Sequence, residues 1–187
     1  MLNTFLSQFV TAWTTKANKY KDGKLNGAFD RFFSLFVPFN TLYQAATDKM
    51  IAEGRISDSD ATDRRMATEH TIAFVEAVRL RNHLRTHCTE ELDKIVELIE
   101  DGTFYVSTDR HTGEADRQSD FRFIEGIKSS DETLFCNGIL NLLYLTRCNM
   151  FHGSKEFKHI QINLLRPMNE VLNQIIVILL SRLRTEA

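Results

Sequence analysis

The stretch TLFCNGILNLLYLT, residues 133–146, contains no charged residue and is apolar on nearly every side of a helical projection. A helix that is apolar all round usually lies in the interior of a protein. Ser129 and Glu132 have the spacing of a capping box that opens such a helix, and Gly153 is placed to end it. The sequence therefore predicts a central, buried helix that runs to about residue 151.

On both sides of this stretch, apolar residues recur at helical spacing and predict further helices. The expected helices cover residues 2–20, 28–53, 57–87, 89–101 and 163–184. The chain has 8 glycines and 2 prolines among 187 residues, too few for the many tight turns of a sandwich or barrel. We therefore predict one domain, residues 1–187, folded as an all-α bundle of five to six helices.

One segment interrupts the helical pattern. The stretch TFYVSTDRHTGEADRQSD, residues 103–120, combines a short β-like run with a turn signal at Gly113. We expect residues 102–129 to form a loop insertion, either irregular or a β-hairpin, that precedes the central helix.

Composition and charge narrow the class of protein. Hydrophobic residues make up 43% and charged residues 26% of the chain, which is typical of a globular fold. A formal net charge of −2 provides no global positive field, so a nucleic-acid partner would need a local basic patch. The 3 cysteines form no CxxC pair, the first residues lack the basic start of a signal peptide, and the apolar run 175–180 is too short to span a bilayer. We expect a cytoplasmic protein without a membrane partner.

The central helix is expected to end on two residues that suit phosphodiester chemistry. Arg147 follows the uncharged run, and His152 lies five residues later. Histidine titrates near neutral pH and can move a proton, whereas arginine binds a phosphate through two N–H groups. In an ideal helix the two side chains point about 140° apart, so a bent helix end or a second subunit must bring them together. A symmetric dimer would place two such pairs at its axis.

The same residues resemble a known family. TRCNMFHGSK, residues 146–155, resembles the Arg-x4-His motif of HEPN domains, and RFFSLFVPFNTLY, residues 31–43, is similar to their aromatic helix. The resemblance implies an all-α, dimeric, metal-independent endoribonuclease of the toxin, antiviral-defence or RNA-processing kind. It implies Arg147 and His152 as the catalytic pair and Asn149 as the residue that orients them or the phosphate. It also implies RNA as substrate, an antitoxin or regulatory protein as a further partner, and no cofactor.

A second basic stretch is the best candidate for binding the RNA backbone. RLRNHLRTH, residues 79–87, contains three arginines and two histidines and no acid. The residues expected to contact RNA are Arg79, Arg81, Arg85 and His83. The alternative is a solvated basic face that pairs with Glu76 and Glu90. His83 and His87 also have the spacing of two metal ligands, but no further ligand completes a site, and we predict no metal.

Two further interpretations of the whole chain stay open. Cys148 stands where HEPN domains commonly have a polar residue, which favours a non-catalytic HEPN-like module that binds RNA, a nucleotide or a partner protein. In the other, the chain is a helical interaction protein in which Arg147 is a structural ion paired with a carboxylate. No Walker A loop, GxGxxG or GxSxG motif supports a nucleotide-hydrolysing, dinucleotide-dependent or serine-hydrolase function.

Overall fold

A computed structural model describes residues 4–20, 24–109, 111–151 and 161–185 of the chain. The longer helices in these ranges are α1 (Thr4–Asn18), α2 (Leu25–Ala52), α5 (Ala77–His87), α6 (Thr89–Glu100), α7 (Arg117–Lys128), α8 (Glu132–Phe151) and α9 (Ile162–Thr185). Between α2 and α5 lie a 3₁₀ turn (Asp58–Asp60), α3 (Asp63–Arg65), a π-helical turn (Met66–His70) and α4 (Thr71–Val75). The all-α prediction is confirmed for the described part of the chain.

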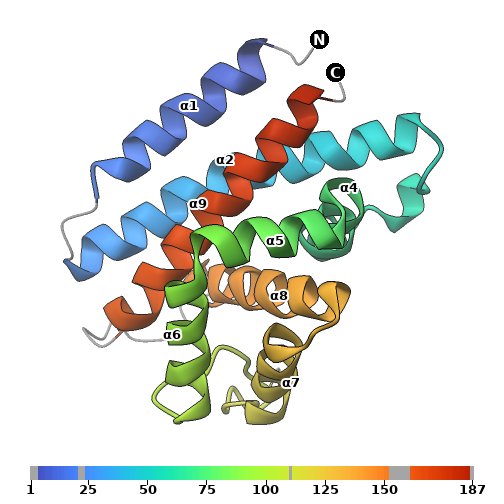
Figure 1. Cartoon of the computed structure of the whole chain (residues 1–187). Helices are drawn as coiled ribbons and strands as arrows, with labels where there is room; N and C mark the ends of the chain where they lie inside the picture. Colours follow the sequence, from blue (N-terminus) through green and yellow to red (C-terminus); the bar gives the residue numbers. More distant parts are fainter. Residues whose placement is uncertain (1–3, 21–23, 110, 152–160, 186–187) are drawn as a thin grey trace.

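The helices are arranged around α2 and α9, which pack against each other (Figure 1). On the outside of this pair, α1 covers α2. On the other side, α5 and α6 pack against α9, and α8 packs against α5. Helix α7 lies against α8, at the end of the molecule opposite α1 (Figure 1). Helix α8, whose residues 133–146 carry no charge, therefore has neighbours on several sides, as this composition predicts.

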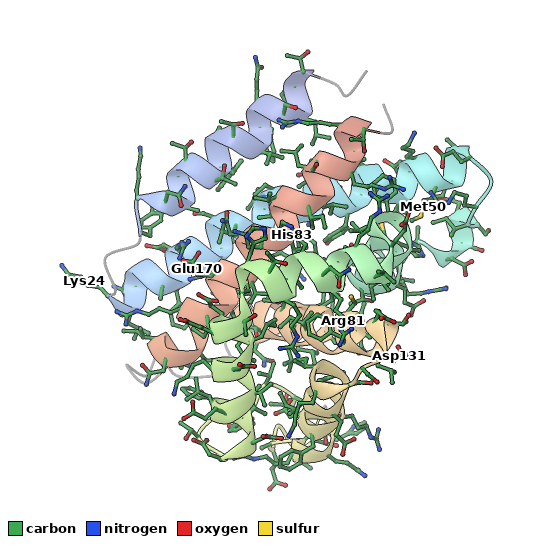
Figure 2. All side chains as sticks on the ribbon, in the orientation of Figure 1. Lys24, Met50, Arg81, His83, Asp131 and Glu170 are labelled. Atoms are coloured by element: carbon green, nitrogen blue, oxygen red, sulfur yellow. The ribbon has the colours of Figure 1, made fainter. Side chains whose placement is uncertain are left out.

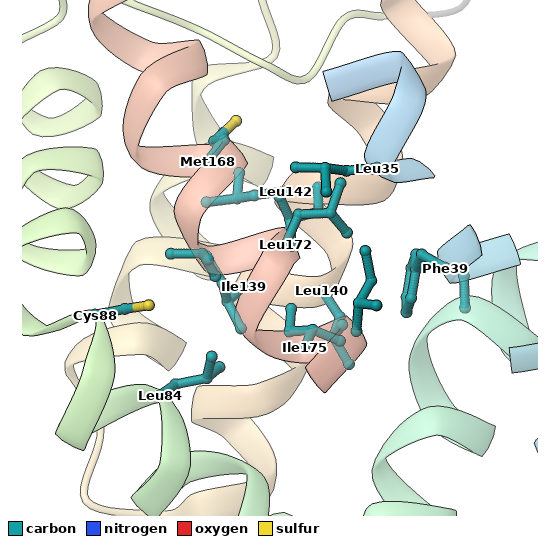
Figure 3. Close-up of a cluster of buried hydrophobic side chains, with 14 of the residues drawn as sticks. Leu35, Phe39, Leu84, Cys88, Ile139, Leu140, Leu142, Met168, Leu172 and Ile175 are labelled. Atoms are coloured by element: carbon teal, nitrogen blue, oxygen red, sulfur yellow. The ribbon is translucent and has the colours of Figure 1, made fainter. Parts of the chain in front are cut away.

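The core forms where these helices meet (Figure 3). Leu35 and Phe39 of α2, Leu84 of α5, Leu140 of α8 and Leu172 of α9 are each at most 1% exposed. Burying one such side chain stabilises a protein by roughly 1.5–3 kcal/mol. The aromatic repeat of α2 supplies much of this core, with Phe36 and Phe39 in edge-to-face contact at 5.5 Å between ring centroids.

Several expected helices are confirmed within a few residues. The segment expected over residues 28–53 is α2, which ends in a Schellman motif: Gly54 has φ +70°, and Arg55 N donates to Met50 O. The segment over 89–101 is α6, and the central helix is α8. Its first turn is capped by Asp131, whose Oδ1 accepts from Leu134 N at 2.8 Å. Asp131, and not Ser129 as expected, is therefore the N-cap residue.

The single helix expected over residues 57–87 is wrong. The chain is divided into short helical segments, and it breaks completely at Glu76, where φ is +75° and α5 begins one residue later. Ser57 and Asp60 have the spacing of a capping box, but the side chain of Ser57 makes no capping hydrogen bond and that of Asp60 pairs with Arg65. Thr62 takes the capping role instead by accepting from Arg65 N. The described residues therefore hold more helical segments than the five or six expected.

The insertion expected over residues 102–129 is correct only for its first half. Residues 102–109 and 111–116 contain no named strand, but the backbone pairs antiparallel around Gly113: Thr108 and Ala115 form a bridge, Asp109 N donates to Glu114 O, and Asp116 N donates to Ser107 O. The second half is helix α7. Asp116 caps it by accepting from Ser119 N at 3.1 Å, and Ile124 and Ile127 on its inner face are each 1% exposed. Packing of this face on α8 outweighs the polar character that suggested a loop.

Helix α9 is long and apolar enough to cross a membrane by length and composition alone. However, 56% of its most apolar stretch is buried inside the described bundle. The central helix of a folded domain has the same composition, and α9 packs against α2, α5 and α6.

A buried histidine in the π-helical turn should make the fold sensitive to acid. His70 is 3% exposed, and its Nδ1 lies 3.2 Å from Thr47 Oγ1. Burial, assisted by the charge of Arg65, lowers the pKa of His70 below its ordinary value of 6.5. The unfolded chain therefore takes up a proton on His70 near pH 6.5, whereas the folded chain takes it up only at lower pH. The contribution of neutral His70 to the free energy of unfolding is complete above about pH 6.5 and is lost as the pH falls below that value. Burial also lowers the pKa of His83.

We expect the urea midpoint to fall between pH 8 and pH 5, and to fall less steeply in His70→Gln. His111→Gln, at an exposed turn, is the matched control and should keep the full slope. An unchanged slope in His70→Gln would show that His70 does not couple folding to pH.

Candidate functional site

Arg147 lies near the C-terminal end of α8, and contacts from two other helical segments fix its position. Its Nη1 is 3.6 Å from Oδ2 of Asp63 in α3. Its guanidinium carbon lies over the ring of Phe36 in α2, 5.6 Å from the centroid. The side chain is still 27% exposed. A guanidinium presents its N–H groups in a planar fork that matches the oxygens of a phosphate.

Asp63 is the centre of this arrangement. Tyr43 of α2 donates its hydroxyl to Oδ1 at 2.5 Å, and Tyr144 of α8 donates to Oδ2 at 3.1 Å. Burial, and then Asp63 itself, raises the pKa of Tyr43 well above its ordinary value. Burial, Asp63 and Cys148 raise the pKa of Tyr144 to about 12. Both phenols therefore stay protonated at neutral pH and act as donors, so the Asp63 carboxylate is held for its interaction with Arg147.

Asn149 has a different environment from the one expected of it. Two helical residues turn about 200°, so Arg147 and Asn149 project from opposite sides of α8. The Nδ2 of Asn149 donates to Val106 O at 2.5 Å. Segment 106–107 is in turn held by the buried Asp120 of α7, which accepts from Val106 N and Ser107 N at 2.8 Å each. In this structure Asn149 connects α8 to the irregular segment, on the side of the helix opposite Arg147.

The other half of the predicted catalytic pair is His152, which lies outside the described residues, as does the expected helix stop at Gly153. Helix α8 is described to Phe151, so the chain reaches His152 directly from the end of the helix that carries Arg147.

The four residues predicted to bind RNA lie on α5, and each already has a partner in the fold. The Nε of Arg79 donates to Glu76 at 3.0 Å. Arg81, which Figure 2 labels on α5, has its Nη1 3.5 Å from Glu132 at the start of α8. Arg85 lies 3.6 Å from Asp93 and donates to Ile127 O, at the C-terminal end of α7.

Two of these arginines share one aromatic neighbour. The guanidinium groups of Arg81 and Arg85 lie 5.8 and 5.0 Å from the ring centroid of Phe135. His83 points elsewhere, with Nε2 3.0 Å from Gln174 Oε1 of α9. The acidic partner expected at Glu76 is present, whereas Asp93 and Glu132 take the place of Glu90. Arg79, with 60% of its side chain exposed, is the most accessible of the three arginines.

Arg81 and Arg85 of α5 contact the N-terminal part of α8, whereas Arg147 lies near its C-terminal end. Phe135 and Arg147 are twelve residues apart, which corresponds to about 18 Å along a helix. One strand of RNA would have to extend along α8 to reach both. Among the described residues, no group of three His, Cys, Asp or Glu side chains is placed to hold a metal ion.

Sequence reasoning missed the residues that position Arg147. Tyr144 could have been found, because it lies three residues before Arg147 on the same helix. Tyr43 lies in the aromatic stretch 31–43, but nothing in that pattern points to a role at Arg147. Asp63 had no local signal, because its contact with Arg147 depends on how α3 packs against α8.

Removing the charge of Asp63 tests whether it positions Arg147. Because the pair is partly exposed, we expect Asp63→Asn to lower any RNA-cleaving kcat by roughly fivefold, equivalent to about 1 kcal/mol. The KM should be unchanged or lower, because a phosphate would no longer compete with the carboxylate. Asp60, three residues before Asp63, forms a comparable ion pair with Arg65. The control variant Asp60→Asn removes that ion pair and should change neither kcat nor KM. A higher KM at constant kcat in Asp63→Asn would contradict a positioning role.

Comparison of the chain with models of protein families, with curated proteins and with solved structures finds no match. The resemblance to HEPN domains therefore stays a prediction, and the function must be argued from the geometry of the chain itself.

Proposed function

We propose that this protein is a metal-independent endoribonuclease of the HEPN kind, with Arg147 and His152 as its catalytic pair. The supporting observation is the environment of Arg147. Its guanidinium is held by Asp63 and Phe36 just after the uncharged stretch 133–146 of α8, yet its side chain is 27% exposed. A group that is fixed before substrate arrives loses little energy to reorganisation when charge develops on a phosphate.

The chemistry follows from the two side chains. The 2′-hydroxyl of RNA is an internal nucleophile that attacks the neighbouring phosphorus once its proton is removed. The P–O bond to the 5′ oxygen then breaks, and that oxygen takes up a proton. The products are a 2′,3′-cyclic phosphate and a 5′-hydroxyl, with no net change in protons. His152 would transfer a proton, and Arg147 would bind the phosphate oxygens whose charge increases in the transition state.

A homodimer fits this proposal because the reaction has two proton transfers and each chain offers one Arg147/His152 pair. Two copies related by a twofold axis would supply a base and an acid at one site. Toxin or defence proteins of this kind also work with an antitoxin or regulatory protein, which is a further proposed partner. We place the reaction in the cytoplasm, where the three free cysteines would stay reduced.

Comparing the cleavage of RNA with that of DNA tests the proposed function. Purified protein in excess EDTA is incubated with an RNA and with the DNA of the same sequence, and the products are resolved on a gel. We expect the RNA to be cut to fragments with cyclic phosphate ends and the DNA to stay intact. Cleavage of the DNA would rule out the 2′-hydroxyl as the nucleophile. Intact RNA at high protein concentration would show that the protein is not a ribonuclease.

The alternative function is a non-catalytic HEPN-like module that binds RNA, a nucleotide or a protein. One observation favours it: Arg147 already has a carboxylate partner, as a structural ion would. This alternative expects saturable RNA binding without cleavage, weakened when Arg81 and Arg85 are replaced. Since Arg85 also caps α7, binding by such variants must be compared at equal folded fraction.

A further inference from the structure

Arg64 of α3 is an exposed arginine whose partner is an amide and not a carboxylate. Its Nε and Nη2 donate to Oδ1 of Asn141 in α8, at 3.1 and 2.7 Å. Among the described residues, no carboxylate forms an ion pair with Arg64, whereas the next residue, Arg65, pairs with both Asp60 and Glu69. A guanidinium stays protonated in proteins, so Arg64 presents a positive charge that no neighbouring acid neutralises.

The contact with Asn141 holds the guanidinium of Arg64 in place before any ligand is present. Asn141 donates its Nδ2 to Asn137 O at 2.8 Å, one turn earlier in α8, and this bond turns its Oδ1 toward Arg64. Arg64 therefore uses its Nε and one N–H of Nη2 within the fold. Its Nη1 donates to no acceptor in the part of the chain that the structure describes. Nη1 and the second N–H of Nη2 form a fork that matches two oxygens of a phosphate.

Arg64 lies against the same face of α8 as Arg147. Asn141 contacts Arg64, and farther along α8 Tyr144 and Arg147 both contact the preceding residue of α3, Asp63. These three residues of α8 are three positions apart, so they lie within about 120° of the helix surface. The rise from Asn141 to Arg147 is about 9 Å. The phosphates of a stacked strand are about 3.4 Å apart along its axis, so this rise corresponds to two or three nucleotides.

We propose that Arg64 is a second phosphate-binding residue of the RNA site, and that it contacts a backbone phosphate two or three nucleotides from the one bound by Arg147. The inference rests on the proposed function and deepens it, because it assigns the path of the RNA strand along α8 and past α3. That path differs from the one expected along α5, whose arginines each pair with a carboxylate: Arg79, Arg81 and Arg85.

The salt dependence of binding tests the proposal without requiring cleavage. The probe is a fluorescent six-nucleotide RNA with 2′-O-methyl groups, which has no 2′-hydroxyl to act as the nucleophile. Each phosphate contact to a single strand contributes about 0.7 to the slope of log Kd against log salt concentration. We expect Arg64→Gln to lower the slope by about 0.7. Binding should therefore weaken roughly fivefold at about 0.1 M salt and be unchanged near 1 M.

Three further variants separate a phosphate contact from loss of charge elsewhere and from loss of packing. Arg184→Gln removes another exposed arginine with a neutral partner, Ser7 Oγ at 3.4 Å, and should leave the slope unchanged. Asn141→Ala removes the contact between α3 and α8 but keeps the charge of Arg64, so the slope should be retained. Arg64→Lys also keeps the charge and should retain the slope while binding more weakly than wild type.

The outcomes distinguish the phosphate contact from the proposed enzyme. The proposal is overturned if the RNA does not bind, if Arg64→Gln keeps the wild-type slope, or if Arg184→Gln lowers the slope equally. An equal loss of slope in Asn141→Ala would show that Arg64 acts through packing and would also overturn it. The expected loss of slope in a protein that cuts no RNA would keep the contact and overturn the enzyme. Cleavage of RNA with an unchanged slope in Arg64→Gln would keep the enzyme and overturn the contact.

Discussion

Replacing Arg147 with lysine is expected to lower the rate of RNA cleavage by roughly 100- to 1,000-fold, the usual effect of losing one preorganised donor to a developing charge. Lysine keeps the positive charge but loses the planar fork that binds two phosphate oxygens at once. It also loses the flat contact with the ring of Phe36. Arg147→Ala should have the larger effect of the two. Initial rates on a fluorescent RNA in EDTA provide the measurement.

Stability measurements separate this expectation from a purely structural role. The ion pair between Arg147 and Asp63 is partly exposed, so its loss should cost about 1 kcal/mol or less. Arg182→Lys is the matched control, because the side chain of Arg182 is exposed to a similar extent, 22%, and pairs with Glu76 at 2.9 Å. It should keep full activity. A large fall in Tm for Arg147→Ala, with cleavage unchanged per folded molecule, would identify Arg147 as a structural ion.

The largest expected effect on stability is at Gly138, in the middle of α8. A Cβ atom here would collide with the backbone oxygen of Phe123 and would lie 2.9 Å from Ile127 Cγ1, both in α7. Gly126 of α7 is equally close, since its Cβ would lie 2.7 Å from Leu134 O. The two helices therefore approach through paired glycines. Overpacking of this kind costs roughly 1–3 kcal/mol, and more when backbone must move, so Gly138→Ala should lower stability by at least that much.

The direction of this effect is informative, because Gly→Ala in a helix otherwise stabilises it by about 1 kcal/mol. Asn137→Ala, one residue earlier and half-buried, is the control and should change stability by less than about 0.5 kcal/mol. Urea denaturation of the three proteins measures the differences. A Gly138→Ala variant as stable as wild type would show that α7 and α8 do not approach this closely.

The helices that could be predicted from sequence are those with an uninterrupted apolar pattern. The phenylalanines of α2 recur at helical spacing, and the helix ends two residues before Gly54, so the pattern and the terminator agree. The uncharged run of α8 similarly predicted a central position. Where the pattern was locally weaker the prediction was wrong. Helix α7 was assigned to an insertion because its sequence starts with polar residues, and its stability comes from its contact with α8.

The candidate site could be predicted only in part, for the same reason. Arg147 was identified by its position after an uncharged run, which is a local feature. Asp63 and Tyr43 position it through tertiary contacts, and no spacing in the sequence brings them together. The break at Glu76, with φ of +75°, likewise depends on packing around α4 and α5, because glutamate has no intrinsic preference for that conformation.

Cleavage of RNA by wild type and by His152→Ala, with excess EDTA throughout, tests the central claim most directly. Structured and unstructured RNAs are incubated with each protein, and the products are separated on a gel. Cleavage by wild type alone, with the variant folded, is the result that a metal-independent Arg/His ribonuclease predicts, and the loss should reach roughly 100- to 10,000-fold. Equal cleavage by both proteins, or intact RNA in both lanes, would contradict it.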